Sequence, residues 1–219
     1  MARWANEDAW TTAIKDAASR HGVPYPLVQA VIGVESAFRP GAYRVEPDKG
    51  TDNDSAGLMQ ILYSTAQGEG YDGTFGDSTT LSGLFDPVTN IEYGTSYLAR
   101  QYQRAGGDIS AAASAYNGGW RPDIGFGAKA TKPLSIILAR DPQGNVTKRR
   151  QVKPGEFSNQ PYVDAVLANF AYFDAKRRAS EGITQFVTPT TETGAVNPKL
   201  LAALVGLLLG LLGIRSWRR

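Results

Sequence analysis

The feature that most constrains the fold of this chain is a succession of helical segments separated by glycine and proline. Apolar residues recur at helical spacing within each segment. Gly22 and Pro24 separate the first two, and Asp86 with Pro87 supplies an N-cap and a first turn for a later one. The predicted helices cover residues 4–20, 26–36, 55–66, 87–105, 109–116 and 162–178. The sequence therefore predicts a mostly α-helical domain.

One segment differs from this pattern. Residues 135–140 and 146–152 are strand-like and flank a turn sequence, which predicts a β-hairpin. The hairpin lies within residues 118–156, a basic insertion with eight basic and three acidic residues. We therefore expect a single domain over residues 1–178 that carries this hairpin, followed by a Thr/Pro/Gly-rich linker at 179–198.

The C-terminal residues 199–219 predict a membrane-spanning tail. Leu200 to Ile214 are apolar without interruption, and basic residues flank them. At ~1.5 Å per residue this run is shorter than a ~30 Å hydrocarbon core, but flanking Lys and Arg side chains can reach the interface. The alternative is an amphipathic or core helix, which the lack of a polar face disfavours. The flanking positive charge places the globular domain outside the cell membrane.

Composition narrows the chemistry by exclusion. The chain has no Cys and a single His, so thiol chemistry and Cys-ligated metals are absent, and a Ser-His-Asp triad would depend on His21 alone. We expect no metal and no cofactor, and catalysis by carboxylates, hydroxyls and amides. The net charge of +2 combines +4 in residues 199–219 with −2 in the rest, so nucleic-acid binding by the domain is not expected.

Glu35 is the strongest catalytic candidate from the residues alone. It lies at the end of an otherwise apolar helix, beside Val31 and Ile32. Such surroundings raise a carboxyl pKa and keep a general acid protonated near neutral pH. Spacing alone leaves open a helix-end glutamate that reaches solvent.

Several short motifs accompany Glu35 in a fixed order. They are Glu35-Ser36 with Phe38 and Pro40, Gly57-Leu58-Met59-Gln60, Asp86-Pro87 with Asn90, Gly94 and Tyr97-Leu98, Ala115-Tyr116-Asn117, and Pro161-Tyr162-Val163. In this order they resemble the soluble lytic transglycosylase (SLT) family over about residues 8–175. The resemblance implies a goose-type lysozyme-like fold with a groove for a glycan strand.

The resemblance also implies a mechanism and a set of site residues. Glu35 would protonate the bond between N-acetylmuramic acid and N-acetylglucosamine in peptidoglycan, and the muramic C6 hydroxyl would close a 1,6-anhydro ring. Tyr116 would hydrogen-bond Glu35 and complete the catalytic pair. The substrate-binding residues implied are Ser55, Met59, Gln60, Asn117 and Tyr162. Asn90 and Gly94 are interpreted as scaffold, and Ser36 as a residue that stabilises the local fold or assists the acid.

The sequence departs from the family pattern in three places. Residues 40–55 are long and acidic; they could cover the groove, supply a second carboxylate for a water-using muramidase, or remain a solvated loop, and they match no calcium loop. The basic insertion could attract the carboxylates of peptidoglycan or be merely solvated.

The third departure is a membrane tail without an N-terminal secretory pattern, which favours a phage virion enzyme that opens the wall for genome entry. A conjugation-type or tail-anchored bacterial enzyme is the other setting. The functional alternatives are a water-using muramidase and a non-catalytic glycan-binding or structural virion protein.

Overall fold

The computed structural model describes residues 2–46, 54–67 and 80–182. Its helices are α1 (Thr11–His21), α2 (Tyr25–Glu35), α3 (Tyr63–Gln67), α4 (Pro87–Arg104), α5 (Ile109–Gly118) and α6 (Gln160–Ser180), with 3₁₀ turns η2 (Ser82–Phe85) and η3 (Pro122–Ile124). The strands are β1 (Tyr43–Arg44), β2 (Ser55–Ala56), β3 (Ile61–Leu62), β4 (Leu134–Arg140) and β5 (Val146–Val152). The predicted mostly helical fold with a β-hairpin is confirmed.

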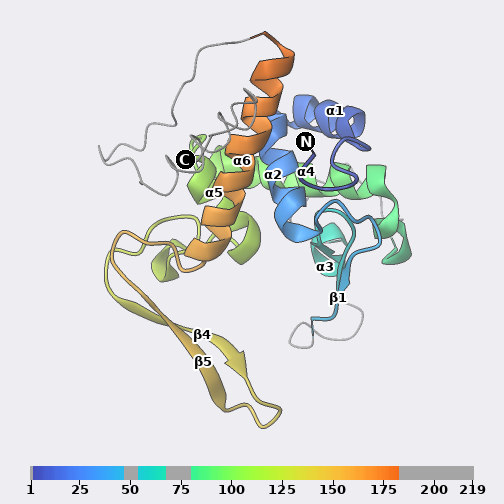
Figure 1. Cartoon of the computed structure of the whole chain (residues 1–219). Helices are drawn as coiled ribbons and strands as arrows, with labels where there is room; N and C mark the ends of the chain where they lie inside the picture. The colour runs from blue at the N-terminus through green and yellow to red at the C-terminus, as the bar shows by residue number, and fades with distance from the viewer. Residues whose placement is uncertain (1, 47–53, 68–79, 183–219) are drawn as a thin grey trace, which may run out of the picture.

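Helix α2 is the central element of the core. Every residue from Pro26 to Gly33 is buried, and α6 lies along one side of α2 (Figure 1). A methyl group at Gly33 would lie 2.8 Å from the Trp4 ring, so glycine permits this close approach. Trp4 in turn stacks on Phe173 of α6, with ring centroids 5.8 Å apart. Residues 4–10, which the sequence predicts as the start of a helix, form turns that deliver Trp4 to this cluster.

The predicted helix over residues 55–66 is wrong. This segment forms β2, a turn, β3 and the start of α3, in an antiparallel sheet of order β1-β2-β3. Gly57 has φ +78° and Gln60 has φ +47°, which are left-handed values that no right-handed helix contains. A Cβ atom on Gly57 would lie 2.2 Å from the Asn90 amide, so α4 packs directly on the turn.

Asn90 of α4 holds that turn in place. Its amide nitrogen donates to the carbonyls of Ala56 and Leu84 at 2.9 and 2.8 Å, and its oxygen accepts from the Met59 N–H at 2.7 Å. The side chain is fully buried. These bonds support the interpretation of Asn90 as scaffold, because they use its amide within the fold.

The hairpin β4–β5 projects away from the helical body (Figure 1). Leu134 pairs with Val152 at its base and Arg140 with Val146 near its tip, and the register shifts on both sides of Ala139. The hairpin therefore extends from the domain as a ribbon.

The predicted tail at 199–219 and residues 183–198 of the predicted linker lie outside the described residues. Within residues 2–46, 54–67 and 80–182, no helix is both long enough and apolar enough to cross a membrane. The domain limits given above stay predictions.

Candidate active site

Glu35 is the last residue of α2, and its side chain is only partly buried. The next turn of chain is unusual, because Ala37 and Phe38 adopt φ of +52° and +60°. Phe38 is fully buried and packs against both Trp4 and Phe173, with centroid distances of 5.4 and 5.7 Å. The core therefore holds a strained turn directly after Glu35, a feature that clusters at functional sites.

Burial raises the pKa of Glu35 to about 7, against an ordinary value of 4.5. The hydrogen bond from Tyr162 and the charge of Arg44 lower this pKa, whereas the negative charge of Glu46 raises it. The C-terminal end of α2 adds a partial negative charge beside the carboxyl group, which also disfavours its ionisation. At neutral pH Glu35 is thus divided between its acid and its base forms, as a group that must both give and take a proton requires.

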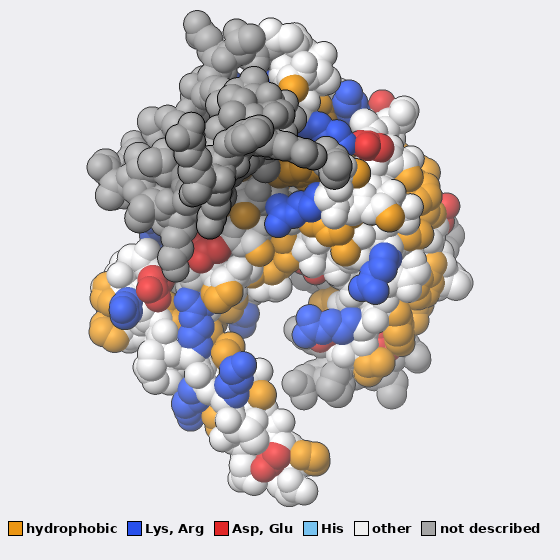
Figure 2. Space-filling model, in the orientation of Figure 1, with side chains coloured by type: hydrophobic (Ala, Val, Ile, Leu, Met, Phe, Trp, Pro, Cys, Tyr) orange, Lys and Arg blue, Asp and Glu red, His pale blue; other side chains and the backbone are white. Residues whose placement is uncertain are grey.

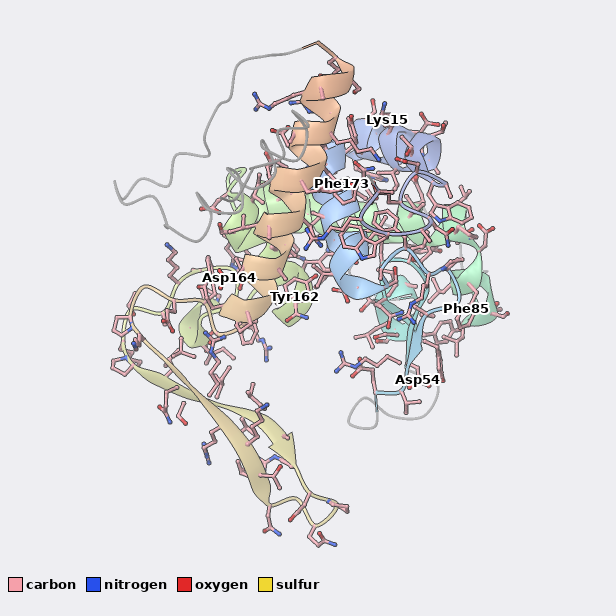
Figure 3. All side chains as sticks on the ribbon, in the orientation of Figure 1. Lys15, Asp54, Phe85, Tyr162, Asp164 and Phe173 are labelled. Carbon is pink, nitrogen blue, oxygen red and sulfur yellow. The ribbon has the colours of Figure 1, made fainter. Side chains whose placement is uncertain are left out.

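The hydroxyl that donates to Glu35 belongs to Tyr162, with an O–O distance of 2.6 Å. Tyr162 lies in the first turn of α6 (Figure 3). The family resemblance predicts this bond for Tyr116, whose hydroxyl instead donates to the carbonyl of Met59 at 2.8 Å. The correction follows from the packing of α6 along α2, which brings Tyr162 to the end of the helix that carries Glu35.

Tyr116 lies close behind this pair. Its ring meets the Tyr97 ring edge-on, with centroids 5.3 Å apart, and it is buried. Burial and the neighbouring Glu35 raise the pKa of Tyr162 well above its usual range, so Tyr162 stays a hydrogen-bond donor throughout the neutral range. Tyr116 thus supports the turn that precedes Gln60, and Tyr162 contacts the acid.

An open cavity of about 510 Å³ lies in front of Glu35. Its size falls within the usual range for small-ligand sites. Its lining residues are Glu35, Arg39, Gly41, Ala42, Tyr43 and Gln60. Polar side chains and backbone thus surround the acid, which suits a neutral, hydroxyl-rich ligand.

The Gly57-Leu58-Met59-Gln60 motif contributes only one of its side chains to this cavity. Gln60 donates its amide to the carbonyls of Ala42 and Gly57, both at 3.0 Å, so the side chain braces the cavity wall. Met59 is fully buried, and a Cβ atom on Gly94 would come within 2.3 Å of its sulfur. Met59 was expected to line a sugar subsite; its side chain instead fills the core behind the cavity, because Gly94 leaves room for it.

Ser55 is not among the residues that line the cavity. It is buried, and its hydroxyl donates to Glu46 at 3.1 Å. Arg44 contacts the same Glu46 carboxylate at 3.2 Å. The sequence predicts Ser55 as a substrate ligand, whereas in the structure its hydroxyl holds the carboxylate that follows β1. Ser36 is buried and bonds the Ile32 carbonyl at 3.2 Å, in agreement with a structural role.

Asn117, near the end of α5, is exposed and tied to the start of α6. Asn159 donates to the Asn117 side-chain oxygen at 2.9 Å and to the Ser114 carbonyl at 3.0 Å. The Ser114 hydroxyl donates back to Asn159 at 2.8 Å. With its oxygen occupied, Asn117 presents its amide N–H groups to solvent.

The sequence reasoning missed the residues of β1 and the turn before it. Arg39, Tyr43 and Arg44 reach the cavity or act on the charge of Glu35. Their proximity to Glu35 in sequence was a usable signal, but a two-residue strand leaves too little periodicity to show which way its side chains point. Asn159 was missed for a different reason, since its role depends on the pairing of α5 with α6.

The described part of the chain contains no group of three or more His, Asp or Glu side chains placed to hold a metal ion. Most of the acidic stretch that raised the question of calcium, residues 47–53, lies outside the described residues.

The Transglycosylase SLT domain profile matches residues 12–132, more than half of this chain. The chain belongs to the SLT transglycosylase family. The residues matched to the SLT domain include Glu35, Gln60 and Asn117, whereas Tyr162 lies beyond them.

A comparison with an individual protein also indicates a relationship to lytic transglycosylases. The membrane-bound lytic murein transglycosylase C of Serratia proteamaculans (strain 568) is 30% identical over 175 residues, which cover 75% of this chain and 46% of the relative. The chain thus spans about half the length of that curated relative.

Solved structures share the fold of this SLT domain. An inactive mutant of the lytic transglycosylase Slt from Pseudomonas aeruginosa superposes with a TM-score of 0.55 at 21% identity, over 81% of this chain and 25% of that one. The 70-kDa soluble lytic transglycosylase in complex with bulgecin A gives a TM-score of 0.50 at 24% identity, over 77% of this chain and 24% of that one. The lysozyme-like SLT fold predicted from the motifs is confirmed.

Proposed function

We propose that this protein is a peptidoglycan lytic transglycosylase that cleaves the β-1,4 bond between N-acetylmuramic acid and N-acetylglucosamine and leaves a 1,6-anhydromuramoyl end. The single observation that carries the proposal is Glu35, an acid with a pKa of about 7 that faces an open polar cavity and receives a hydrogen bond from Tyr162. Membership of the SLT family and the name of the Serratia relative support it.

In the proposed mechanism one carboxyl group serves two steps. Protonated Glu35 gives its proton to the glycosidic oxygen as the bond to the anomeric carbon breaks. The Glu35 carboxylate then takes the proton of the muramic C6 hydroxyl, whose oxygen attacks that carbon and closes the ring. No water is consumed, and the attacking group is already part of the substrate. The N-acetyl group of the substrate stabilises the cationic centre.

In this proposal the remaining residues position the acid and the sugar. Tyr162 orients Glu35 and steadies its carboxylate form between the two steps, because a hydrogen bond to the charged form stabilises it. Gln60 fixes the cavity wall, and the free amide N–H groups of Asn117 bind sugar hydroxyl or acetyl oxygens. Met59 and Tyr116 support the wall from the core.

Mass spectrometry of digested sacculi tests the reaction. We expect fragments that end in anhydromuramic acid. A Glu35→Gln variant should bind sacculi without releasing fragments from them. Fragments heavier by one water would show that the enzyme is a muramidase and not a transglycosylase. Full digestion by the Glu35→Gln variant would exclude Glu35 as the acid.

A water-using muramidase is the second candidate, and Glu46 is the observation that favours it. Glu46 lies near enough for its charge to raise the pKa of Glu35, so a second carboxylate stands at the site. Ser55 and Arg44 engage Glu46, however, which leaves it poorly placed to activate water. A Glu46→Gln variant that keeps its anhydro products would exclude the two-carboxylate plan. A non-catalytic glycan-binding virion protein is the third reading, and the Glu35→Gln digestion test decides it.

For the cellular setting, we propose a membrane attachment through residues 199–219 with the domain facing the wall. The apolar run in the sequence supports this proposal, as does the relative's name, membrane-bound. Removal of residues 199–219 should release the protein from membranes while activity is retained. A role in phage genome entry stays a prediction, which fractionation of purified particles for this protein tests.

A further inference from the structure

The hairpin β4–β5 is the largest feature of the molecule that the proposed reaction does not use. It carries Arg140, Lys148, Arg149 and Arg150 against one acid, Asp141, for a net charge of +3 over residues 134–152. The Asp141 carboxylate turns inward and accepts hydrogen bonds from the backbone of Gln143 and Asn145 and from the Asn145 side chain. The arm therefore carries an excess of positive charge, and Arg150 at its base also pairs with Glu156 at 3.7 Å.

The position of the arm in the sequence connects it to the active site. The arm lies between Asn117, which accepts a hydrogen bond from Asn159 just before α6, and Tyr162, which donates to Glu35. In the space-filling view the arm stands across an open hollow from the helical body, and Lys and Arg side chains gather along it and on the opposite wall (Figure 2). A ligand that filled this hollow would contact the arm.

The base of the arm is fixed. Arg150 donates to the Ser158 carbonyl at 3.0 Å, and the Ser158 N–H donates to the Gly125 carbonyl at 2.8 Å. Ala130 and Glu156 are also joined through their backbones, at 2.8 Å. These bonds join the base of the ribbon to the segments that precede β4 and α6.

The charged groups of Lys148 and Arg149, in the outer half of the arm, are available to bind a ligand. Among the described residues, none hydrogen-bonds to or pairs with the charged groups of Lys148 or Arg149, and both side chains are exposed. Lys148 pairs across the ribbon with Ala139 and Arg149 with Ile137, so the two cations point to opposite faces. Ile137 and Leu138 beside them are 41% and 49% exposed, so apolar surface lies next to the two cations.

We propose that the β4–β5 arm binds the peptide stems of a glycan strand that extends from the cavity into the hollow, with Lys148 and Arg149, one on each face of the ribbon, contacting carboxylates of different stems and Ile137 and Leu138 contacting alanine methyl groups. The proposal rests on the proposed function, since it takes the same polymer as the ligand. Stems branch from the glycan at intervals and carry both carboxylates and small apolar groups, which are the partners that this mixture of cations and aliphatic side chains can contact.

Binding to substrates with and without stems tests the proposal. In a Glu35→Gln background that prevents cleavage, Lys148→Gln with Arg149→Gln should weaken binding to intact sacculi about fivefold to tenfold at low salt. The loss should shrink as salt increases. Binding to glycan strands stripped of their stems by an amidase should match that of the parent protein.

A matched variant controls for net charge. Lys15→Gln with Arg104→Gln removes two exposed positive charges from helices α1 and α4, and it should leave binding to both substrates unchanged. Equal weakening by the two double variants would overturn the proposal in favour of general attraction. Unchanged binding of the Lys148 and Arg149 double variant to sacculi would also overturn it.

Two further outcomes distinguish this proposal from membrane binding by the arm and from failure of the proposed function. If the double variant loses binding to phosphatidylglycerol vesicles but keeps binding to sacculi, the arm contacts a membrane and the proposal is wrong. Failure of the proposed function itself has a different signature, because the unmodified protein would then release no anhydromuramoyl fragments from either substrate.

Discussion

Glu35 can start the proposed reaction only while its carboxyl group holds a proton, and burial places the pKa of that group at about 7. Activity should therefore fall as pH increases through about 7. Tyr162→Phe removes a hydrogen bond that lowers this pKa, so the alkaline limb of the pH–rate profile should move to higher pH while kcat falls. Tyr116→Phe is the control, since its bond goes to the Met59 carbonyl. A profile displaced equally by both variants would contradict the assignment of Tyr162.

The same raised pKa makes Glu35 a cost to stability. The unfolded chain ionises this group near 4.5, whereas the folded protein keeps its proton to about 7. The folded state therefore binds more protons between these values, and stability falls as pH increases from about 4.5 to about 7. Glu35→Gln removes this cost, so it should stabilise the protein at pH 8 by at most about 3 kcal/mol and change little at pH 4.

Thermal unfolding at the two pH values checks that prediction. Glu92→Gln is a useful opposite case: burial raises the pKa of Glu92, but hydrogen bonds from Arg20 and His21 outweigh it and lower the pKa overall. Glu92→Gln should therefore reduce stability at pH 8. If Glu35→Gln also reduced stability at pH 8, the ionised Glu35 carboxylate would not destabilise the folded protein.

Among the elements, the turn from Gly57 to Gln60 depends most on a single side chain. Asn90→Ala would leave the carbonyls of Ala56 and Leu84 and the N–H of Met59 without their partner in a buried place. We expect a loss of about 2–4 kcal/mol in chemical denaturation, because unsatisfied buried polar groups are costly. Gln103→Ala, an exposed position on the same helix, should change stability by less than about 0.5 kcal/mol. An Asn90→Ala variant as stable as this control would refute the role of Asn90.

The elements also show what a sequence can and cannot reveal. The helix after Asp86 was predictable because its cap and first turn are local, and the Asp86 carboxylate does accept the Thr89 N–H at 2.8 Å. The hairpin followed from alternation and turn residues in the same way. The turn at Gly57 was not predictable as a turn, because its left-handed residues are stabilised by Asn90, which is distant in sequence.

The site residues also differ in whether local sequence or tertiary packing reveals them. Glu35 was a candidate from the sequence, because an acid at the end of an apolar helix can lose solvation, but spacing alone left open a side chain that reaches solvent. Its partner was not predictable, because the choice between Tyr116 and Tyr162 depends on how α6 packs against α2. Met59 and Ser55 were placed near the site by their motif, but only the packing shows that both side chains are buried.

At the scale of the whole molecule, Glu7 joins the N-terminal turns to the last helix. It is 1% exposed, and it accepts hydrogen bonds from Lys176 at 2.8 Å, from Tyr172 at 2.7 Å, and from the backbone of Arg3. These bonds secure Trp4 over α2 and so close the core around the helix that carries Glu35.

Glu7 should set the acid limit of folding. Burial alone raises the pKa of Glu7, but its hydrogen bonds, led by that from Lys176, outweigh burial and lower the pKa below 4.5. Its contribution to stability is therefore complete above about 4.5 and is lost as pH falls through the lower folded pKa. Glu7→Gln should lower the melting temperature at pH 7. Below pH 4.5 the melting temperature of this variant should fall less steeply with decreasing pH than that of the unmodified protein. Asp8→Asn, which removes an exposed partner of the same Lys176, should do neither to a comparable extent. Equal acid sensitivity in Glu7→Gln and the unmodified protein would place the acid limit at another carboxylate.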